Sequence, residues 1–132
     1  MLNLNQGVRS TAVKGRARIL VVDDSEDNCT MMAMLLGHLG HTVETARTVT
    51  EAVKLTGSGP RDLYIIDSYF TDARGTELCR KIRALDPAAS VLFYSTAYGN
   101  ADLEAALQSG ARAFVLKPDI DELLRTIARL LD

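Results

Sequence analysis

The order of apolar segments constrains this chain more than any other feature. Five apolar runs of strand length alternate with stretches that carry a helical pattern of apolar residues. Strict alternation of this kind indicates a doubly wound α/β fold, in which five βα units form a parallel sheet with helices on both faces. The 132 residues suffice for one such domain. The runs are residues 19–22, 42–45, 63–66, 91–94 and 114–116.

The pattern inside the segments predicts which side chains form the core. Residues 19–22 are apolar throughout, as in a strand buried on both faces, whereas residues 42–45 alternate as an edge strand does. Between the runs, apolar residues recur at helical spacing and are expected to face the sheet. These residues are Met32, Leu35, Leu36 and Leu39; Leu78, Ile82 and Leu85; Leu103, Ala106 and Leu107; and Ile120, Leu123, Leu124, Ile127 and Leu131.

Polar residues follow four of the five predicted strands closely. Asp23 and Asp24 follow the first run and Asp67 the third, while Thr96 and Lys117 come shortly after the fourth and directly after the fifth. The carboxyl ends of parallel strands share one edge, where doubly wound folds have their functional crevice. We therefore expect all five residues to meet at this edge.

Three carboxylates held close together repel one another, and a hard divalent cation compensates for this. Mg²⁺ fits, because it prefers oxygen ligands and commonly combines carboxylates with phosphate oxygens. A carboxylate can also act as a nucleophile toward phosphorus, and phosphoryl transfer depends mainly on positioning and charge stabilisation. Asp67, at the end of the central strand, is the best candidate for this nucleophile, with Lys117 supplying a positive charge.

Several motifs occur in a characteristic order. Residues 19–25 read Ile-Leu-Val-Val-Asp-Asp-Ser, Gly75 follows Asp67 by eight residues, and Ala97 follows Thr96. The closing segment adds Gly110, Ala111, Phe114, Lys117 and Pro118. Together these motifs resemble the receiver domain of bacterial two-component response regulators, in its stand-alone, CheY-like form. The resemblance covers about residues 17–132 and implies the flavodoxin-like strand order 2-1-3-4-5.

The resemblance also implies a chemistry. Asp67 would accept a phosphoryl group from a sensor histidine kinase or a histidine phosphotransfer protein. Mg²⁺ would be bound directly by Asp24, Asp67 and the main-chain carbonyl of Tyr69, with Asp23 acting mostly through water. Lys117 would contact the phosphoryl group.

The family further implies a switch. Thr96 would shift to hydrogen-bond a phosphoryl oxygen, and Phe114 would turn inward into the vacated space. The surface of the fourth helix, fifth strand and fifth helix would then change shape and be recognised by a downstream protein. Such a domain catalyses its own phosphorylation and dephosphorylation but is not a conventional enzyme. Because the chain ends with its last helix, we expect output through a protein contact, unless the chain is part of a longer regulator.

The loop after the proposed acceptor departs from the family. Residues 68–71 read Ser-Tyr-Phe-Thr, where an apolar-methionine-proline pattern is usual. Tyr69 and Tyr98 each lie two residues past a functional residue, at positions that border the path of the hydrolytic water in this family. We hypothesise that these two tyrosines slow the loss of the phosphoryl group.

Three other functions fit the same fold. A receiver-like adaptor that works without phosphate remains open. A flavodoxin-like cofactor binder requires a phosphate cradle after the first strand, and the four acids within residues 23–27 disfavour it. A phosphatase with an aspartyl nucleophile usually has a second acid two residues later, where this chain has Tyr69.

Composition narrows the setting. The net charge of −2 gives no sign of direct nucleic-acid binding, and no apolar run approaches the roughly 20 residues that cross a membrane. The cysteines, Cys29 and Cys79, are compatible with a cytoplasmic location. Residues 1–16 contain three basic residues and no acid, and we interpret them as a flexible N-terminal tail before a receiver domain at 17–132.

Overall fold

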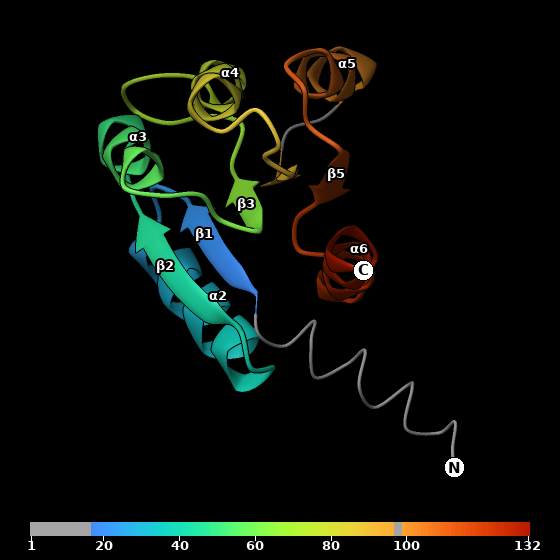
Figure 1. Cartoon of the computed structure of the whole chain (residues 1–132). Coiled ribbons are helices and arrows are strands. Elements are labelled where there is room, and N and C mark those ends of the chain that lie inside the picture. Colours follow the sequence, from blue (N-terminus) through green and yellow to red (C-terminus); the bar gives the residue numbers. More distant parts are fainter. Residues whose placement is uncertain (1–16, 97–98) are drawn as a thin grey trace.

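The structure, a computed structural model, describes residues 17–96 and 99–132 (Figure 1). The predicted tail, Ala97 and Tyr98 lie outside these ranges, so the hypothesis for Tyr98 stays a prediction. Strands and helices alternate through the described ranges. They are β1 (Arg18–Val22), α2 (Glu26–His38), β2 (Thr42–Ala46), α3 (Val49–Gly57), β3 (Leu63–Ile66), α4 (Gly75–Leu85), β4 (Val91–Ser95), α5 (Asn100–Gln108), β5 (Ala113–Leu116) and α6 (Ile120–Leu131).

The five strands form one parallel sheet in the order β2-β1-β3-β4-β5. Helices α2 and α6 cover one face, and α3, α4 and α5 cover the other (Figure 1). The predicted doubly wound fold and its strand order are therefore confirmed. None of the helices within the described ranges has the length and apolar character needed to cross a membrane.

The central strands carry the core because both of their faces are covered. Every residue of β3 and β4 is buried. Alternate side chains point to opposite faces, so Tyr64 and Ile66 join the core under α3, α4 and α5, while Leu63 and Ile65 join the core under α2 and α6. This two-sided burial explains why the run at residues 63–66 has no polar position.

Four leucines predicted to face the core are instead exposed. Leu39 lies past the last turn of α2 and Leu85 is the last residue of α4, and their exposed fractions are 48% and 51%. Leu103 and Leu107 of α5 are 39% and 46% exposed. In α5, Ala106 of the same predicted stripe is buried. The prediction was thus wrong for these four side chains.

A buried arginine lies near the end of the sheet where the strands begin, opposite to their carboxyl ends. Arg61 precedes β3, and its side chain is only 1% exposed. Its guanidinium donates two hydrogen bonds to Glu44 Oε1, at 3.0 and 2.7 Å, and others to the main-chain carbonyls of Leu55 and Gly59. A buried charge of this kind is tolerated only because its donors are paired.

Replacing Arg61 by Met should lower the free energy of unfolding by about 3 kcal/mol, because buried carbonyls lose their donors. Urea unfolding measures this loss. Arg18→Met is the matched control, since Arg18 Nη2 lies 3.7 Å from the same Glu44 oxygen but its side chain is half exposed. The control should lose less than about 1 kcal/mol. Equal losses in the two variants would contradict this account.

Candidate functional site

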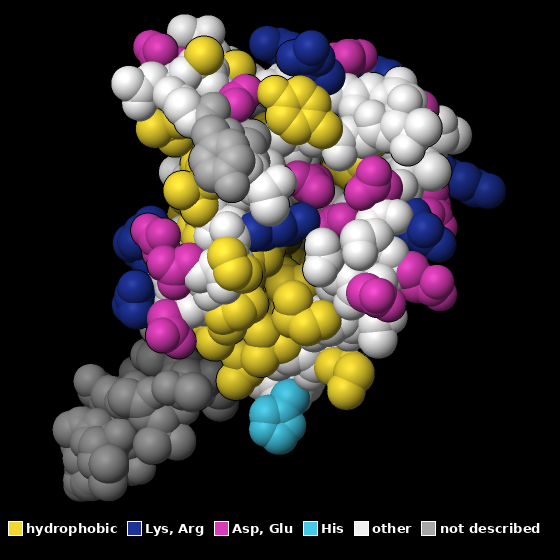
Figure 2. All heavy atoms as spheres, turned by 180° about the vertical axis from the view of Figure 1, so that it is seen from behind, with side chains coloured by type: hydrophobic (Ala, Val, Ile, Leu, Met, Phe, Trp, Pro, Cys, Tyr) yellow, Lys and Arg dark blue, Asp and Glu magenta, His cyan; other side chains and the backbone are white. Residues whose placement is uncertain are grey.

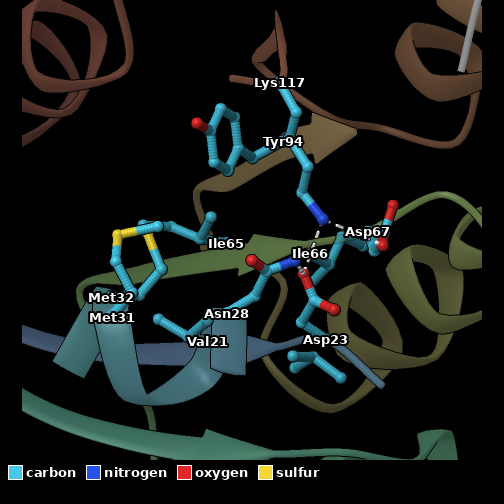
Figure 3. Close-up of a pocket in the computed structure, with 11 residues that line it drawn as sticks. Val21, Asp23, Asn28, Met31, Met32, Ile65, Ile66, Asp67, Tyr94 and Lys117 are labelled. Carbon is cyan, nitrogen blue, oxygen red and sulfur yellow. Dashed lines mark hydrogen bonds and ion pairs between the residues drawn. The ribbon is translucent and has the colours of Figure 1, made fainter. Parts of the chain in front are cut away.

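An ammonium group joins the carboxyl ends of three strands. Lys117 follows β5, and its Nζ lies 2.7 Å from Asp23 Oδ2 and 3.2 Å from Asp67 Oδ2 (Figure 3). Asp23 follows β1 and Asp67 follows β3, so these residues lie 94 and 50 positions away from Lys117 in the sequence. The side chains of all three are mostly buried. These contacts join three of the five polar residues that the sequence singled out, and a fourth, Asp24, lies beside them.

Asp23 is the best-supported carboxylate of the cluster. It is 6% exposed, and besides Lys117 it accepts hydrogen bonds from the main-chain N–H of Ser25 at 2.9 Å and from Asn28 Nδ2 at 3.4 Å. Ser25 caps α2 by accepting a hydrogen bond from the Asn28 N–H. The same short segment, residues 23–28, therefore caps α2 and supplies hydrogen bonds to the buried Asp23 carboxylate.

Asp24 lies beside this pair and is exposed. One carboxylate oxygen from each of Asp23, Asp24 and Asp67 lies within 4.8 Å of the others. Three carboxylates and one ammonium leave a formal charge of −2, and the oxygens are the hard donors that Mg²⁺ prefers. The donor set therefore fits one divalent cation.

The cluster also sets the charge state of its lysine. Burial alone would lower the pKa of Lys117, but the hydrogen bonds and negative charges of Asp23 and Asp67 outweigh burial, so the pKa of Lys117 is raised. A raised lysine pKa keeps the ammonium charged throughout the physiological range. The contacts of Lys117 with the two acids, and their stabilising effect, would be lost only as the pH rises through that elevated pKa.

The loop between β3 and α4 holds Asp67 by backbone contacts. The Ser68 N–H donates to Asp67 Oδ1 at 2.7 Å, and the Gly75 N–H donates to the Ser68 carbonyl at 2.7 Å. A Cβ on Gly75 would lie 2.1 Å from the Asp67 carbonyl oxygen. Gly75 is therefore needed for the close approach of α4 to the end of β3. Tyr69 lies in this loop with an exposed side chain, and the role of its carbonyl stays a prediction.

The two predicted switch residues lie outside the cluster. Thr96 follows β4 at the same edge of the sheet and is exposed, and no hydrogen bond within residues 17–96 and 99–132 joins it to Asp67. Phe114 of β5 is partly buried and stacks on Phe93, with ring centroids 6.1 Å apart. The structure thus places Thr96 at the exposed edge of the sheet and Phe114 against the core. Their switching roles stay predictions.

Three contacts of this site were not predicted from the sequence. Asn28 reaches back to Asp23, Tyr94 lies under the Lys117 ammonium at 5.8 Å, and Arg47 donates two hydrogen bonds to the Asp24 carbonyl at 3.2 and 3.1 Å. Only the positions of Asn28 and Arg47 in the sequence could have marked them as site residues. Arg47 directly follows β2, and Asn28 lies in the first turn of the helix after β1. Their partners could not be read from hydrophobic periodicity.

Comparison with known proteins agrees with this geometry. The profile of the response regulator receiver domain matches residues 19–128. The transcriptional regulatory protein ZraR of Salmonella typhimurium is 31% identical over 121 residues, which are 90% of this chain and 27% of that protein. The chain therefore spans about a quarter of the length of this relative, and 52% of the length of the response regulator ArlR of Staphylococcus epidermidis.

Solved structures of receiver domains and response regulators are also similar to this chain. A CheY-like receiver domain protein from Methanospirillum hungatei is 29% identical, with a TM-score of 0.84 over 89% of this chain and 94% of that one. The response regulator TrrA of Thermotoga maritima, solved in complex with Mg²⁺ and BeF, is 30% identical, with a TM-score of 0.78 over 87% and 99% of the two chains. The chain belongs to the response regulator receiver family.

The close approach at Gly75 predicts a local sensitivity. Gly75→Ala should lower the free energy of unfolding by about 1–3 kcal/mol, because its Cβ would collide with main-chain atoms at Asp67 and with Phe93. Gly37→Ala is the control, because a Cβ there meets no atom within 4 Å. In α2 that change should stabilise the protein by up to about 1 kcal/mol. Thermal or urea unfolding of both variants tests the contrast, and a neutral Gly75→Ala would refute the proposed collision.

Proposed function

We propose that this domain is the phosphoacceptor of a two-component phosphorelay, in which Asp67 receives a phosphoryl group from a histidine kinase or a histidine phosphotransfer protein. The observation that carries this proposal is the Lys117 ammonium held between the Asp23 and Asp67 carboxylates in a mostly buried site. That arrangement offers one reactive carboxylate next to a fixed positive charge. The histidine-containing partner and a cytoplasmic location follow from this role and stay predictions.

The transfer is a displacement at phosphorus. A carboxylate oxygen of Asp67 attacks the phosphorus, a P–O bond forms, and the P–N bond to the partner's histidine breaks. The electron pair of that bond returns to the imidazole nitrogen, which leaves neutral when the other ring nitrogen carries a proton. Lys117, 3.2 Å from Asp67 Oδ2, is placed to stabilise the negative charge on the transferring oxygens.

Asp23, Asp24, Asp67 and the main-chain carbonyl of Tyr69 would hold Mg²⁺, which neutralises phosphoryl charge when bound. In the phosphorylated state Thr96 would bond a phosphoryl oxygen and Phe114 would turn inward. The face formed by the fourth helix (α5), the fifth strand (β5) and the fifth helix (α6) would then present a changed surface to a downstream protein. The exposed leucines Leu103, Leu107 and Leu116 support this assignment, because they give that face apolar area for a contact.

The proposal predicts one specific label. Incubation with Mg²⁺ and acetyl phosphate should add one phosphoryl group to the wild type by intact mass, and Asp67→Asn should abolish it. Asp72→Asn is the matched control, since Asp72 is an exposed acid of the same loop. The control should be labelled like the wild type. Labelling that persists in Asp67→Asn would exclude Asp67 as the acceptor, and an unlabelled wild type would favour the adaptor that works without phosphate.

An apolar groove beside the site suits the docking of the phosphodonor. Met31, Met34 and Leu35 of α2 face Ile120 of α6 across it, and Met31 also lines the pocket of Asp67 and Lys117. Figure 2 shows apolar side chains gathered in a hollow on this face. Met34 is 70% exposed, and flexible methionines suit a surface that accepts a partner's helix. We infer that the helix bearing the donor histidine lies in this groove.

Met34→Glu should therefore slow phosphotransfer from a phosphorylated histidine kinase that labels the wild type, by about tenfold or more, because a charge enters an apolar contact. Labelling by acetyl phosphate needs no docking and should keep its rate. Leu85→Glu is the control, because Leu85 is similarly exposed on α4 outside the groove. Equal slowing in both variants, or slowing with acetyl phosphate as well, would argue against a docking role.

A further inference from the structure

A side-chain hydrogen bond joins the loop after Asp67 to the first turn of α5. Tyr69 donates its hydroxyl hydrogen to Asp102 Oδ1 at 2.9 Å. The Arg74 guanidinium lies over the Tyr69 ring, 5.4 Å from its centroid, and Arg74 pairs with Tyr69 across a short antiparallel bridge. Tyr69 is thus fixed at both its backbone and its hydroxyl.

Among the residues that the structure describes, few others anchor helix α5 on this side. Of its nine residues Ala106 is buried, whereas α4 buries four residues of eleven. Its N-cap is Gly99, a residue with no side chain that could cap the helix. Because apolar burial holds most helices in place, one charged hydrogen bond is a large share of what fixes the start of α5. The position of α5 should therefore respond to the position of Tyr69.

The loop end of this contact belongs to the proposed phosphorylation site. Tyr69 lies two residues after Asp67, and its main-chain carbonyl is a predicted Mg²⁺ ligand. Tyr69 and Asp102 also line a small cavity together with Phe93, which stacks on Phe114. The cavity leaves room for these side chains to rearrange. A change at Asp67 can thus reach α5 through one residue and one hydrogen bond.

We propose that Asp102 is a positioning residue, which through the Tyr69 hydroxyl couples the state of the Asp67 site to α5 and so to the proposed output face. This inference rests on the proposed function, because it assigns the loop end of the coupling to the metal and phosphoryl site. Coupling between two sites is reciprocal. Mg²⁺ bound at the acids should therefore order the start of α5, and a partner bound to α5 should raise the affinity for Mg²⁺.

The test measures amide hydrogen exchange in α5 with and without Mg²⁺, alongside calorimetric titration of Mg²⁺ into the same proteins. In the wild type, Mg²⁺ should slow exchange at the start of α5 by about two- to tenfold, the range expected for one hydrogen bond. Tyr69→Phe removes only the hydroxyl and should abolish this response. Asp102→Ala should do the same, and the double variant should add nothing further.

Glu104→Ala is the control, since Glu104 is an exposed acid of the same helix that lies away from the Tyr69 contact. It should respond to Mg²⁺ as the wild type does. If Mg²⁺ binds but α5 exchange in the wild type does not change, or if Tyr69→Phe keeps the full response, the coupling is refuted while the proposed function stands. If the wild type binds no Mg²⁺ and takes no phosphoryl group from acetyl phosphate, the proposed function itself fails.

Discussion

The site depends on one ammonium group placed between two carboxylates. Lys117 contacts both Asp23 and Asp67, and the three residues come from the ends of β5, β1 and β3. Without that positive charge, two mostly buried carboxylates and the nearby Asp24 would repel one another in a setting with little water to screen them. With the Lys117 ammonium present, the three carboxylates still leave an excess of negative charge, which favours the binding of a divalent cation. The Lys117 contact thereby helps to orient the Asp67 carboxylate.

The scaffold separates rigid from adaptable parts around this cluster. The core strands are buried on both faces, and the buried Arg61 fixes the opposite edge of the sheet, so the strand ends form a firm base for the acids. Gly75 lets α4 approach the Asp67 backbone closely. By contrast, α5 buries little apolar area and is held partly by the bond between Tyr69 and Asp102. A helix attached in this way can change position at low cost in free energy, as a signalling surface requires.

Sequence patterns predicted the fold and the meeting of the acids because both follow from periodicity and topology. Continuous apolar runs such as residues 63–66 identify buried parallel strands, and a parallel sheet brings their carboxyl ends to one edge. The orientation of α5 was predictable only in part, since Ala106 of the predicted apolar stripe is buried while Leu103 and Leu107 of the same stripe are exposed. Contacts such as Asn28 with Asp23 and Tyr69 with Asp102 join side chains across loops, and no repeating pattern marks them.

The central claim is that three separate strand ends form one cation-holding pocket around a reactive carboxylate. A crystal structure of the protein with Mg²⁺ and beryllofluoride, a phosphoryl mimic, tests it most directly. The account predicts beryllium bonded to an Asp67 oxygen, a fluorine within contact of Lys117, and Mg²⁺ among the carboxylates of Asp23, Asp24 and Asp67. Beryllofluoride absent from Asp67, or Mg²⁺ bound away from these acids, would contradict it.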